Sequence, residues 1–552
     1  MSNISTLKKI RDLQAPATFW YKDTILYEVY VRAFNDSNAD GHGDLRGLTE
    51  KLDYLQELGV DCLWLSPIYP SPLRDDGYDI SNYYDIHPDY GNLDDFSELL
   101  KEAHQRGIRI IMDLVLNHTS DKHPWFRAAR ANRHSLFRDY YVWNDNDQKY
   151  SDARIIFIDS ENSNWTKDEQ AGQYYWHRFY ASQPDLNYDN PNVQDEMLRI
   201  MSFWLDLGVD GFRADAVPYL FERDGTNCEN LPETHDFLKR VRRFINEYYP
   251  GRVLLAEANQ WPEDVLPYFG DGSDEFHMGF HFPVMPRIYM ALRKMDRTPL
   301  VWIMNRTPQL TESCQWCIFL RNHDELTLEM VTEDERNWMW DEYAPEPRMR
   351  LNMGIRRRLA PLLDNDRHKI ELVNSMLFTF PGSPIIYYGD EIGMGDNIWL
   401  PDRNGVRTPM QWTNADDAGF SEVPVQSIYT PVIDNDVYGP KQVNAESQRK
   451  DPNSLWSTIR HMIAIRKQHR AFGWGDFSWL DCGNDAVAAY ERVYQNEHII
   501  VLNNLSDQIQ PVKAAFSGRS RALTDLLTGQ TFAGHDGMIE LDLKPYQYLW
   551  LK

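Results

Sequence analysis

The chain of 552 residues is poor in cysteine. Its five cysteines are an odd number scattered along the chain, which favours a reducing cytoplasm over a disulfide-bonded domain. Cys314 and Cys317 form a C-x-x-C pair. On a strand, which the letters QWCIFL predict, residues three apart point to opposite faces, so we expect no redox or metal site there.

Long apolar runs and positive charge are also scarce. No run approaches the roughly 18 apolar residues of a membrane span, and the start, MSNISTLKKIRDLQ, lacks the apolar core of a signal peptide. The 57 basic residues against 83 acidic ones give a net charge of -26, which repels phosphate backbones and anionic lipid surfaces. We therefore expect a soluble, cytoplasmic protein with no nucleic-acid partner and no membrane partner.

The first 216 residues repeat a pattern of amphipathic helix, glycine and apolar strand. Leucines at helical spacing over residues 45–58 precede Gly59 and VDCLWLSP, and Gly107 and Gly208 separate a helix from a strand in the same way. Strands this uniformly apolar are buried on both faces, as parallel strands covered by helices are. Further strands are predicted in ILYEVYVRAF, IRIIMDLVLNH, VDGFRADA, RVLLAEA, QWCIFLRNHD and PIIYYGDEIG, with a weaker one near EFHMGFHF. Eight strands predict a (β/α)8 TIM barrel of the α/β class.

Two segments interrupt this pattern. Residues 118–189 lack helical periodicity and are rich in Asn, Asp, Trp and Tyr, which is typical of an inserted lid subdomain after the third strand. Residues 473–552 show short alternating strands between Asn, Gly and Asp turns, which predicts a C-terminal antiparallel β-sandwich. The barrel is therefore assigned to residues 1–117 and 190–472.

Three acidic residues, Asp215, Glu257 and Asp324, follow the predicted strands at the end where barrels carry their active sites. Arg213 lies two residues before Asp215, on the same side of a strand, and can hold that carboxylate ionised. An ionised carboxylate about 5 Å from a protonated one is the arrangement of a retaining glycosidase, and Glu257 is the candidate for the protonated group. Isolated salt bridges are the alternative, but three such carboxylates at equivalent strand ends disfavour it.

The segments DLVLNH, GFRADA, LLAEA and FLRNHD occur in that order, and from about Trp20 onward the chain resembles glycoside hydrolase family 13, the α-amylase family. The longer stretches RDDGYDI, YYWHRFYASQPDLNYDNP, AEANQWPEDVLPYFGDG and RTPMQW are similar to the family members that interconvert maltose and trehalose. The resemblance implies that Asp215 is the nucleophile, Glu257 the acid/base and Asp324 the carboxylate that holds the sugar hydroxyls. The substrate-binding residues that it implies are Asp75, Tyr78, His118, Gln183, Arg213, His323 and Arg407, with Asn259 facing the second glucose and Arg154 closing the lid.

Two metal sites are expected. In DSNADGHGD the spacing of Asp36, Asn38, Asp40, the His42 carbonyl and Asp44 fits an oxygen-ligand loop for calcium or magnesium, with a solvated acidic turn as the alternative. The second site, for calcium, is implied by the resemblance alone. Its ligands are Asn117, Asp185, the carbonyls of Tyr219 and Leu220, and Glu222.

The function expected from the resemblance is intramolecular isomerisation of maltose to trehalose through a covalent glucosyl-enzyme, with retention of configuration and minor hydrolysis to glucose. An α-glucosidase or oligo-1,6-glucosidase is the closest alternative, and a non-catalytic amylase-like protein is a third. No organic cofactor is expected, and the oligomeric state, including a homo-oligomer, is left open.

Overall fold

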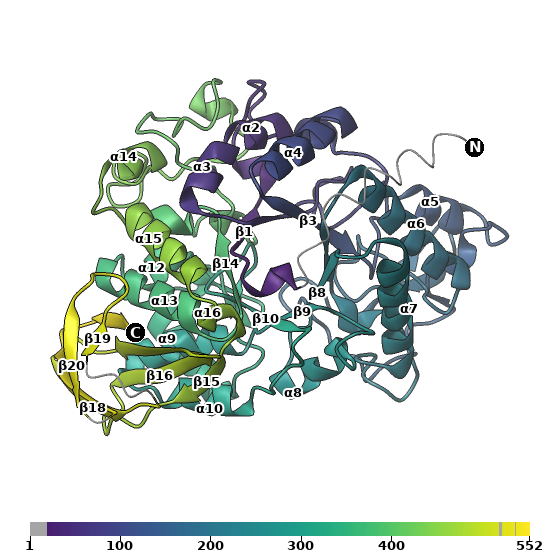
Figure 1. Ribbon diagram of the computed structural model, residues 1–552. Helices are drawn as coiled ribbons and strands as arrows, with labels where there is room; N and C mark the ends of the chain where they lie inside the picture. Colours follow the sequence, from purple (N-terminus) through teal and green to yellow (C-terminus); the bar gives the residue numbers. More distant parts are fainter. Residues whose placement is uncertain (1–18, 518–521, 536) are drawn as a thin grey trace, which may run out of the picture.

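Eight parallel strands close into a barrel at the centre of the computed structural model, which describes residues 19–517, 522–535 and 537–552 (Figure 1). Around the barrel the strand order is β1-β2-β3-β7-β8-β9-β10-β14. Their bounds are Leu26–Val29, Cys62–Leu65, Arg109–Val115, Gly211–Asp215, Val253–Ala256, Met278–Phe280, Gln315–Phe319 and Ser383–Tyr387. The predicted TIM barrel is confirmed, while the residues that carry the signal-peptide expectation lie outside the described ranges.

Helices connect successive strands and cover the outside of the barrel (Figure 1). The longer ones are α4 (Leu93–Gln105), α6 (Pro191–Leu207), α7 (Pro232–Tyr248), α9 (Val284–Lys294), α10 (Thr298–Arg306), α11 (Glu333–Tyr343), α13 (Arg367–Thr379) and α15 (Leu455–Gln468). Gly59, Gly107 and Gly208 follow helices with φ of 100°, 75° and 118°, a left-handed conformation that glycine adopts without a steric penalty.

The helix predicted over residues 45–58 is divided in two. Helix α2 (Leu45–Glu50) ends at Lys51, and α3 (Leu52–Leu58) begins directly after it. The Lys51 N–H bonds to the carbonyls of Leu48 and Thr49 instead of the carbonyl four residues back, so the α-helical hydrogen-bond ladder is interrupted there.

Residues 118–189 lie between β3 and α6. They contain α5 (Pro124–Ala131) and a three-stranded antiparallel sheet in the order β4-β6-β5, with bounds Trp143–Asn144, Gln173–Trp176 and Trp165–Asp168. Bridges between His118 and Asp185 and between Tyr141 and Leu186 close the insert on itself where it leaves the barrel. A second small sheet, β11 (Leu326–Thr327), β13 (Gly354–Ile355) and β12 (Arg350–Leu351), follows β10 and was not predicted.

The C-terminal residues form two four-stranded antiparallel sheets, β15-β16-β17-β22 and β18-β21-β20-β19. The strands are Asp476–Trp479, Val487–Tyr494, Glu497–Asn504, Gln510–Ala515, Ala522–Thr524, Thr531–His535, Met538–Leu543 and Tyr548–Leu551. Leu502 and Leu549 of one sheet share a buried cluster with Val512 and Ile539 of the other, as in a β-sandwich. Figure 1 shows these sheets beside α13 and α16 (Ala471–Trp474).

Two buried arginines meet the C-terminal end of α13, and one of them, Arg492 of β16, joins the sandwich to the barrel. Arg466 of α15 donates to the carbonyl of Phe378, and Arg492 of β16 donates to that of Thr379, both at the C-terminal end of α13. Cations at this end of a helix are stabilised by its dipole and satisfy carbonyls that have no partner within the helix.

The described ranges contain neither a membrane-spanning helix nor a disulfide. No helix there is long and apolar enough to cross a membrane. Cys314 and Cys317 are both buried, and neither they nor the other three cysteines form a disulfide in that part of the chain.

Candidate active site

The three carboxylates singled out from the sequence line one cavity. Asp215 is the last residue of β7, and Glu257 directly follows β8. Asp324 lies on the loop five residues after β10 ends at Phe319, and not at the strand end itself. The barrel therefore brings the three side chains together at its carboxyl-terminal mouth, where TIM-barrel enzymes carry their active sites.

Arg213 of β7 connects the buried acids of this mouth. One of its terminal nitrogens lies 2.5 Å from Asp215 Oδ1 and 2.5 Å from Asp113 Oδ1, and the other contacts Glu257 Oε1. Asp113, which the sequence analysis missed, also accepts hydrogen bonds from Trp64 Nε1 at 2.8 Å and from the Tyr78 hydroxyl at 3.1 Å. Arg213 therefore fixes the relative positions of the two candidate catalytic carboxylates.

The two carboxyl groups differ in proton affinity. Burial raises the pKa of Asp215 to about 6, although Arg213 acts in the opposite direction. Burial raises the pKa of Glu257 to about 8, and the neighbouring charges of Asp215 and Asp324 add to this effect. The expectation that Arg213 favours ionised Asp215 is correct in sign, but burial is the larger effect. Near pH 7 Asp215 is mainly ionised and Glu257 mainly protonated.

The backbone after Asp215 turns sharply. Ala216 has φ 52°, the left-handed region that costs a residue with a Cβ atom about 1 kcal/mol. Its N–H donates to Glu257 Oε2 at 3.1 Å, so this turn contributes to holding Glu257 beside Asp215.

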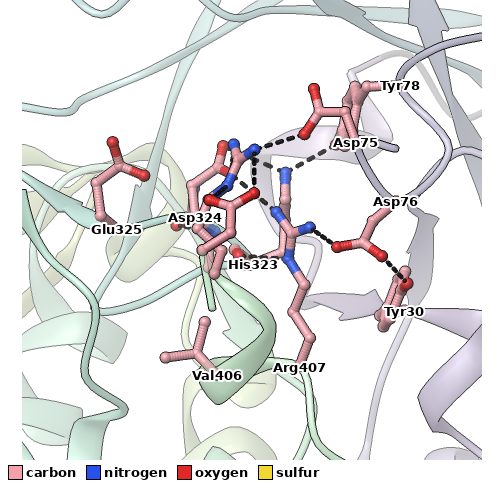
Figure 2. A network of polar contacts seen from close by, with 12 residues as sticks. Tyr30, Asp75, Asp76, Tyr78, His323, Asp324, Glu325, Val406 and Arg407 are labelled. Carbon is pink, nitrogen blue, oxygen red and sulfur yellow. Dashed lines mark hydrogen bonds and ion pairs between the residues drawn. The ribbon is translucent and has the colours of Figure 1, made fainter. Parts of the chain in front are cut away.

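A second charged network forms the opposite wall of the cavity (Figure 2). Arg407 lies 2.5 Å from Asp76 and 3.0 Å from Asp324, and its Nε donates to the backbone carbonyl of His323 at 2.8 Å. These contacts place Arg407 behind the cavity wall and not on it.

Arg403, which the sequence analysis did not name, is a second arginine of this network. It lines the cavity, 2.5 Å from Asp75 and 2.8 Å from Asp324. Arg403 lies in the same loop, PDRNGVR, four residues before Arg407, and that proximity was the available signal. Sequence alone does not show which arginine faces the cavity, because the loop has no regular periodicity.

The other predicted substrate-binding residues divide into two groups. Asp75, Tyr78, His118 and Asn259 line the cavity. Gln183, Arg213 and His323 lie behind it, where Gln183 donates to Asp75 at 2.8 Å and His323 Nε2 lies 2.8 Å from the Tyr78 hydroxyl. The sequence analysis missed further wall residues: Ile156, Phe157, Phe179, Tyr219, Phe282, Asn322, Glu325, Thr327 and Glu329. The aromatic content of residues 118–189 was the only signal for two of them, Phe157 and Phe179.

Arg154 links the lid to two other loops of the mouth. It pairs with Glu229 at 2.9 Å and with Glu329 at 2.8 Å, and it donates to the Tyr219 hydroxyl at 3.1 Å. Tyr219 and Glu329 line the cavity, whereas Arg154 itself does not. Arg154 is thus placed to hold the lid against the barrel.

The residues expected at the second metal site come together between the lid and the barrel. Asn117 Oδ1, Asp185 Oδ2 and Glu222 Oε1 are buried and have no hydrogen-bond partner within the described part of the chain. Unpaired buried oxygens, two of them on carboxylates, are costly without a cation. This donor set fits calcium, which prefers oxygen ligands.

The Asp36 loop differs from that cluster. Both carboxylate oxygens of Asp36 accept hydrogen bonds from backbone amides, and one also accepts from the Ser421 hydroxyl. Asp44 likewise accepts from Ser37 and Gly47, while Asn38 and Asp40 are exposed. Across the described ranges no group of three or more His, Cys, Asp or Glu side chains has a metal-binding arrangement.

Comparison with known families identifies two segments of the chain. Residues 28–344 and 355–475 match the model of the alpha amylase catalytic domain. Residues 477–550 match that of the maltogenic amylase C-terminal domain. The family models therefore divide the chain close to residue 476.

The chain is similar to characterised proteins over most of its length. It is 59% identical to a trehalose synthase/amylase of Mycolicibacterium smegmatis, covering 90% of this chain and 86% of that one. It is 58% identical to a trehalose synthase of Pimelobacter sp. (90% and 88% covered) and 32% identical to an oligo-1,6-glucosidase of Parageobacillus thermoglucosidasius (89% and 91% covered). Among solved structures, a mutant trehalulose synthase in complex with Tris superposes with a TM-score of 0.79 at 29% identity, covering 98% of this chain and 100% of that one.

Proposed function

The chain belongs to the alpha-amylase family of glycoside hydrolases, and from this premise we propose that it is an intramolecular isomerase that converts maltose to trehalose and back. The observation that carries the proposal is the contrast in identity between relatives: 58% to a trehalose synthase but 32% to an oligo-1,6-glucosidase over a similar share of the chain. The cavity with its paired carboxyl groups supplies the chemistry that such a reaction needs.

In the proposed mechanism, Asp215 attacks the anomeric carbon of the non-reducing glucose of maltose. Glu257, protonated near pH 7, donates its proton to the glycosidic oxygen, and the bond to the second glucose breaks. The product is a covalent glucosyl-enzyme and a free glucose that stays in the closed cavity. That glucose turns, and its anomeric hydroxyl attacks the anomeric carbon of the glucosyl-enzyme while the bond to Asp215 breaks and Glu257 takes back a proton. Two inversions at one carbon leave the α configuration unchanged.

The same glucosyl-enzyme reacts with water if the lid opens first, so minor hydrolysis to glucose accompanies isomerisation. An oligo-1,6-glucosidase uses equivalent carboxylates and is the second candidate. A non-catalytic amylase-like protein is disfavoured because Asp215, Glu257 and Asp324 all line one cavity. Counting glycosidic bonds separates the candidates: purified protein and maltose give trehalose at a nearly constant number of bonds for an isomerase, and net loss of bonds for a hydrolase.

The contacts of Arg154 predict how the lid controls this partition. We expect Arg154→Ala to raise the ratio of hydrolysis to isomerisation by about tenfold, because loss of a partly buried charge pair worth about 1–2 kcal/mol lets the lid open more often. The measurement is the ratio of glucose to trehalose formed from maltose. Arg130→Ala is the matched control, since Arg130 pairs with Asp168 at 2.8 Å inside the lid and we expect an unchanged ratio. An unchanged ratio in Arg154→Ala as well would remove Arg154 from the closing mechanism.

We also propose that Asn117, Asp185, the carbonyls of Tyr219 and Leu220, and Glu222 hold calcium and so tie the lid to the barrel. Support comes from three buried oxygens that have no hydrogen-bond partner within the described part of the chain. The bound ion would supply positive charge and cross-link two segments. A second ion, calcium or magnesium, at the Asp36 loop is proposed on the spacing of its acidic residues alone.

Removal of calcium is expected to lower the unfolding temperature of the unmutated protein, because an ion that binds only the folded chain stabilises it by mass action, by about 2.7 kcal/mol at 100 times its Kd. In Glu222→Ala the unfolding temperature starts lower and no longer responds to calcium. The matched control is Glu233→Ala, since Glu233 pairs with Arg223 on the surface and is no candidate ligand. Absence of bound calcium in the purified protein, together with no response to chelator, would refute this site.

The proposal includes the cytoplasm as the site of action, with a soluble disaccharide as the only partner. The net charge of -26 supports the choice of partner, because it disfavours binding to nucleic acids and to anionic membranes. The oligomeric state, a monomer or a homo-oligomer, is left open.

A further inference from the structure

Glu28 lies on β1 and does not line the active-site cavity, and it has no role in the mechanism above. Its side chain is fully buried, and in the barrel sheet Glu28 lies beside Trp64 of β2 and Tyr387 of β14, the two neighbouring strands. Its Oε1 contacts His323 Nδ1, while Oε2 has no partner within the described ranges. A buried carboxylate is costly unless it is paired with a charge, so this single contact needs an explanation.

The other ring nitrogen of His323 also faces acceptors. Nε2 lies 2.8 Å from the Tyr78 oxygen and 3.3 Å from Asp324 Oδ2. The Tyr78 hydroxyl donates its proton to Asp113, so its oxygen accepts from the histidine. Figure 2 shows His323 between Tyr78 and Asp324. A neutral imidazole carries one N–H and can satisfy only one of these two sides, whereas an imidazolium satisfies both.

We propose that Glu28 is a positioning residue of the active site, which holds His323 as an imidazolium whose Nε2–H points to Tyr78 and Asp324. The inference concerns the charge of His323, and it rests on the proposed function only for its kinetic readout.

Loss of the Glu28 charge changes the hydrogen bonds of two groups, Asp324 and the Tyr78–Asp113 pair. A neutral His323 that keeps its proton on Nδ1 presents a lone pair at Nε2, which repels Asp324. The Tyr78 hydroxyl then turns to donate to Nε2 and leaves Asp113, the acid that shares Arg213 with Asp215. Glu28 therefore acts on the sugar-holding carboxylate and on the nucleophile through one ring.

The charged groups that face His323 support this assignment. Glu28 comes from β1, Asp324 from the same loop, and the polar Tyr78 from the segment after β2. Asp113 of β3 also interacts electrostatically with His323, and Arg407, from the segment after β14, donates to the His323 backbone carbonyl. Burial lowers the pKa of His323, but Asp324 and Glu28 together raise it to about 10.

The test is Glu28→Gln, which keeps the shape of the side chain and removes its charge. Glu391→Gln is the matched control, since Glu391 is a fully buried barrel carboxylate that accepts from Tyr27 at 2.9 Å and from Tyr54 at 2.6 Å, outside the cavity. Nuclear magnetic resonance of protein with ¹⁵N-labelled histidine reports the protonation of each ring, and His323→Gln identifies the signal of His323.

At pH 8 we expect both ring nitrogens of His323 to be protonated in the unmutated protein and in Glu391→Gln, but only one in Glu28→Gln. The kcat on maltose falls about 100-fold in Glu28→Gln, the loss expected for a buried charge-assisted hydrogen bond, with little change in KM. Glu28→Asp keeps the charge and is expected to retain the imidazolium with an intermediate kcat, so a folding defect of Glu28→Gln does not leave the inference untested.

A neutral His323 in the unmutated protein at pH 8, or an imidazolium that persists in Glu28→Gln, would overturn the inference whatever the products from maltose. If the imidazolium is present and depends on Glu28 but no trehalose forms, the inference stands and the proposed function fails.

Discussion

Asp215→Asn is expected to abolish trehalose formation and glucose release together, with a loss of about 10⁴-fold or more in kcat for each. Both products arise from one glucosyl-enzyme, in which an oxygen of the Asp215 carboxylate is bonded to the sugar. The carboxamide keeps the shape of the side chain but is not a nucleophile. The measurement is the initial rate of both products from maltose, at enzyme concentrations high enough to detect the residual activity.

Asp210→Asn is the matched control. Asp210 directly precedes β7 and pairs with His104 at 2.7 Å and Arg252 at 2.5 Å, at the opposite end of the barrel from the cavity. We expect both activities to survive in this variant. Loss of only one activity in Asp215→Asn would show that trehalose and glucose come from separate intermediates.

Glu257→Gln is expected to lower kcat on maltose by about 10³- to 10⁴-fold, near the upper end of the range for a general acid, because a sugar leaves poorly without a proton. α-Glucosyl fluoride needs little protonation to leave. Its fluoride release is therefore expected to be much less impaired in Glu257→Gln, whereas Asp215→Asn loses activity on both substrates. Equal losses on maltose and on the fluoride would contradict the role of Glu257 as proton donor.

The pH profile of the unmutated protein follows from the same pair. The reaction needs Asp215 ionised and Glu257 protonated, so kcat/KM falls as the pH drops through about 6 and falls again as it rises through about 8. With α-glucosyl fluoride the alkaline limb is expected to weaken, because protonated Glu257 is then less important.

The barrel and the three carboxylates could be predicted because they depend on regular features. Apolar strands of the right length, such as Cys62–Leu65 and Arg109–Val115, were visible as runs, and a residue at a strand end has a known place in a barrel. Arg213 and Asp215 were correctly expected on one side of a strand, since that spacing is fixed by strand geometry.

The rest of the cavity depends on loops and on side-chain conformations, which have no periodic signal. Arg403 and Arg407 lie four residues apart in one irregular loop, and only the folded chain shows that Arg403 reaches Asp75. Asp113 and Glu28 were hidden inside strands read as purely apolar, because a barrel interior tolerates charges only when partners from distant strands meet them. Those partnerships cannot be read from local sequence.

The most direct measurement of the central claim uses maltose together with isotope-labelled free glucose. The proposed cavity retains the released glucose until it attacks again, and an enclosed reactant has an effective concentration that free glucose cannot match. We expect trehalose to form early, as the main product and almost without label. Extensive early labelling would show that glucose leaves and returns through solvent, and net glucose without trehalose would show that the protein is a hydrolase.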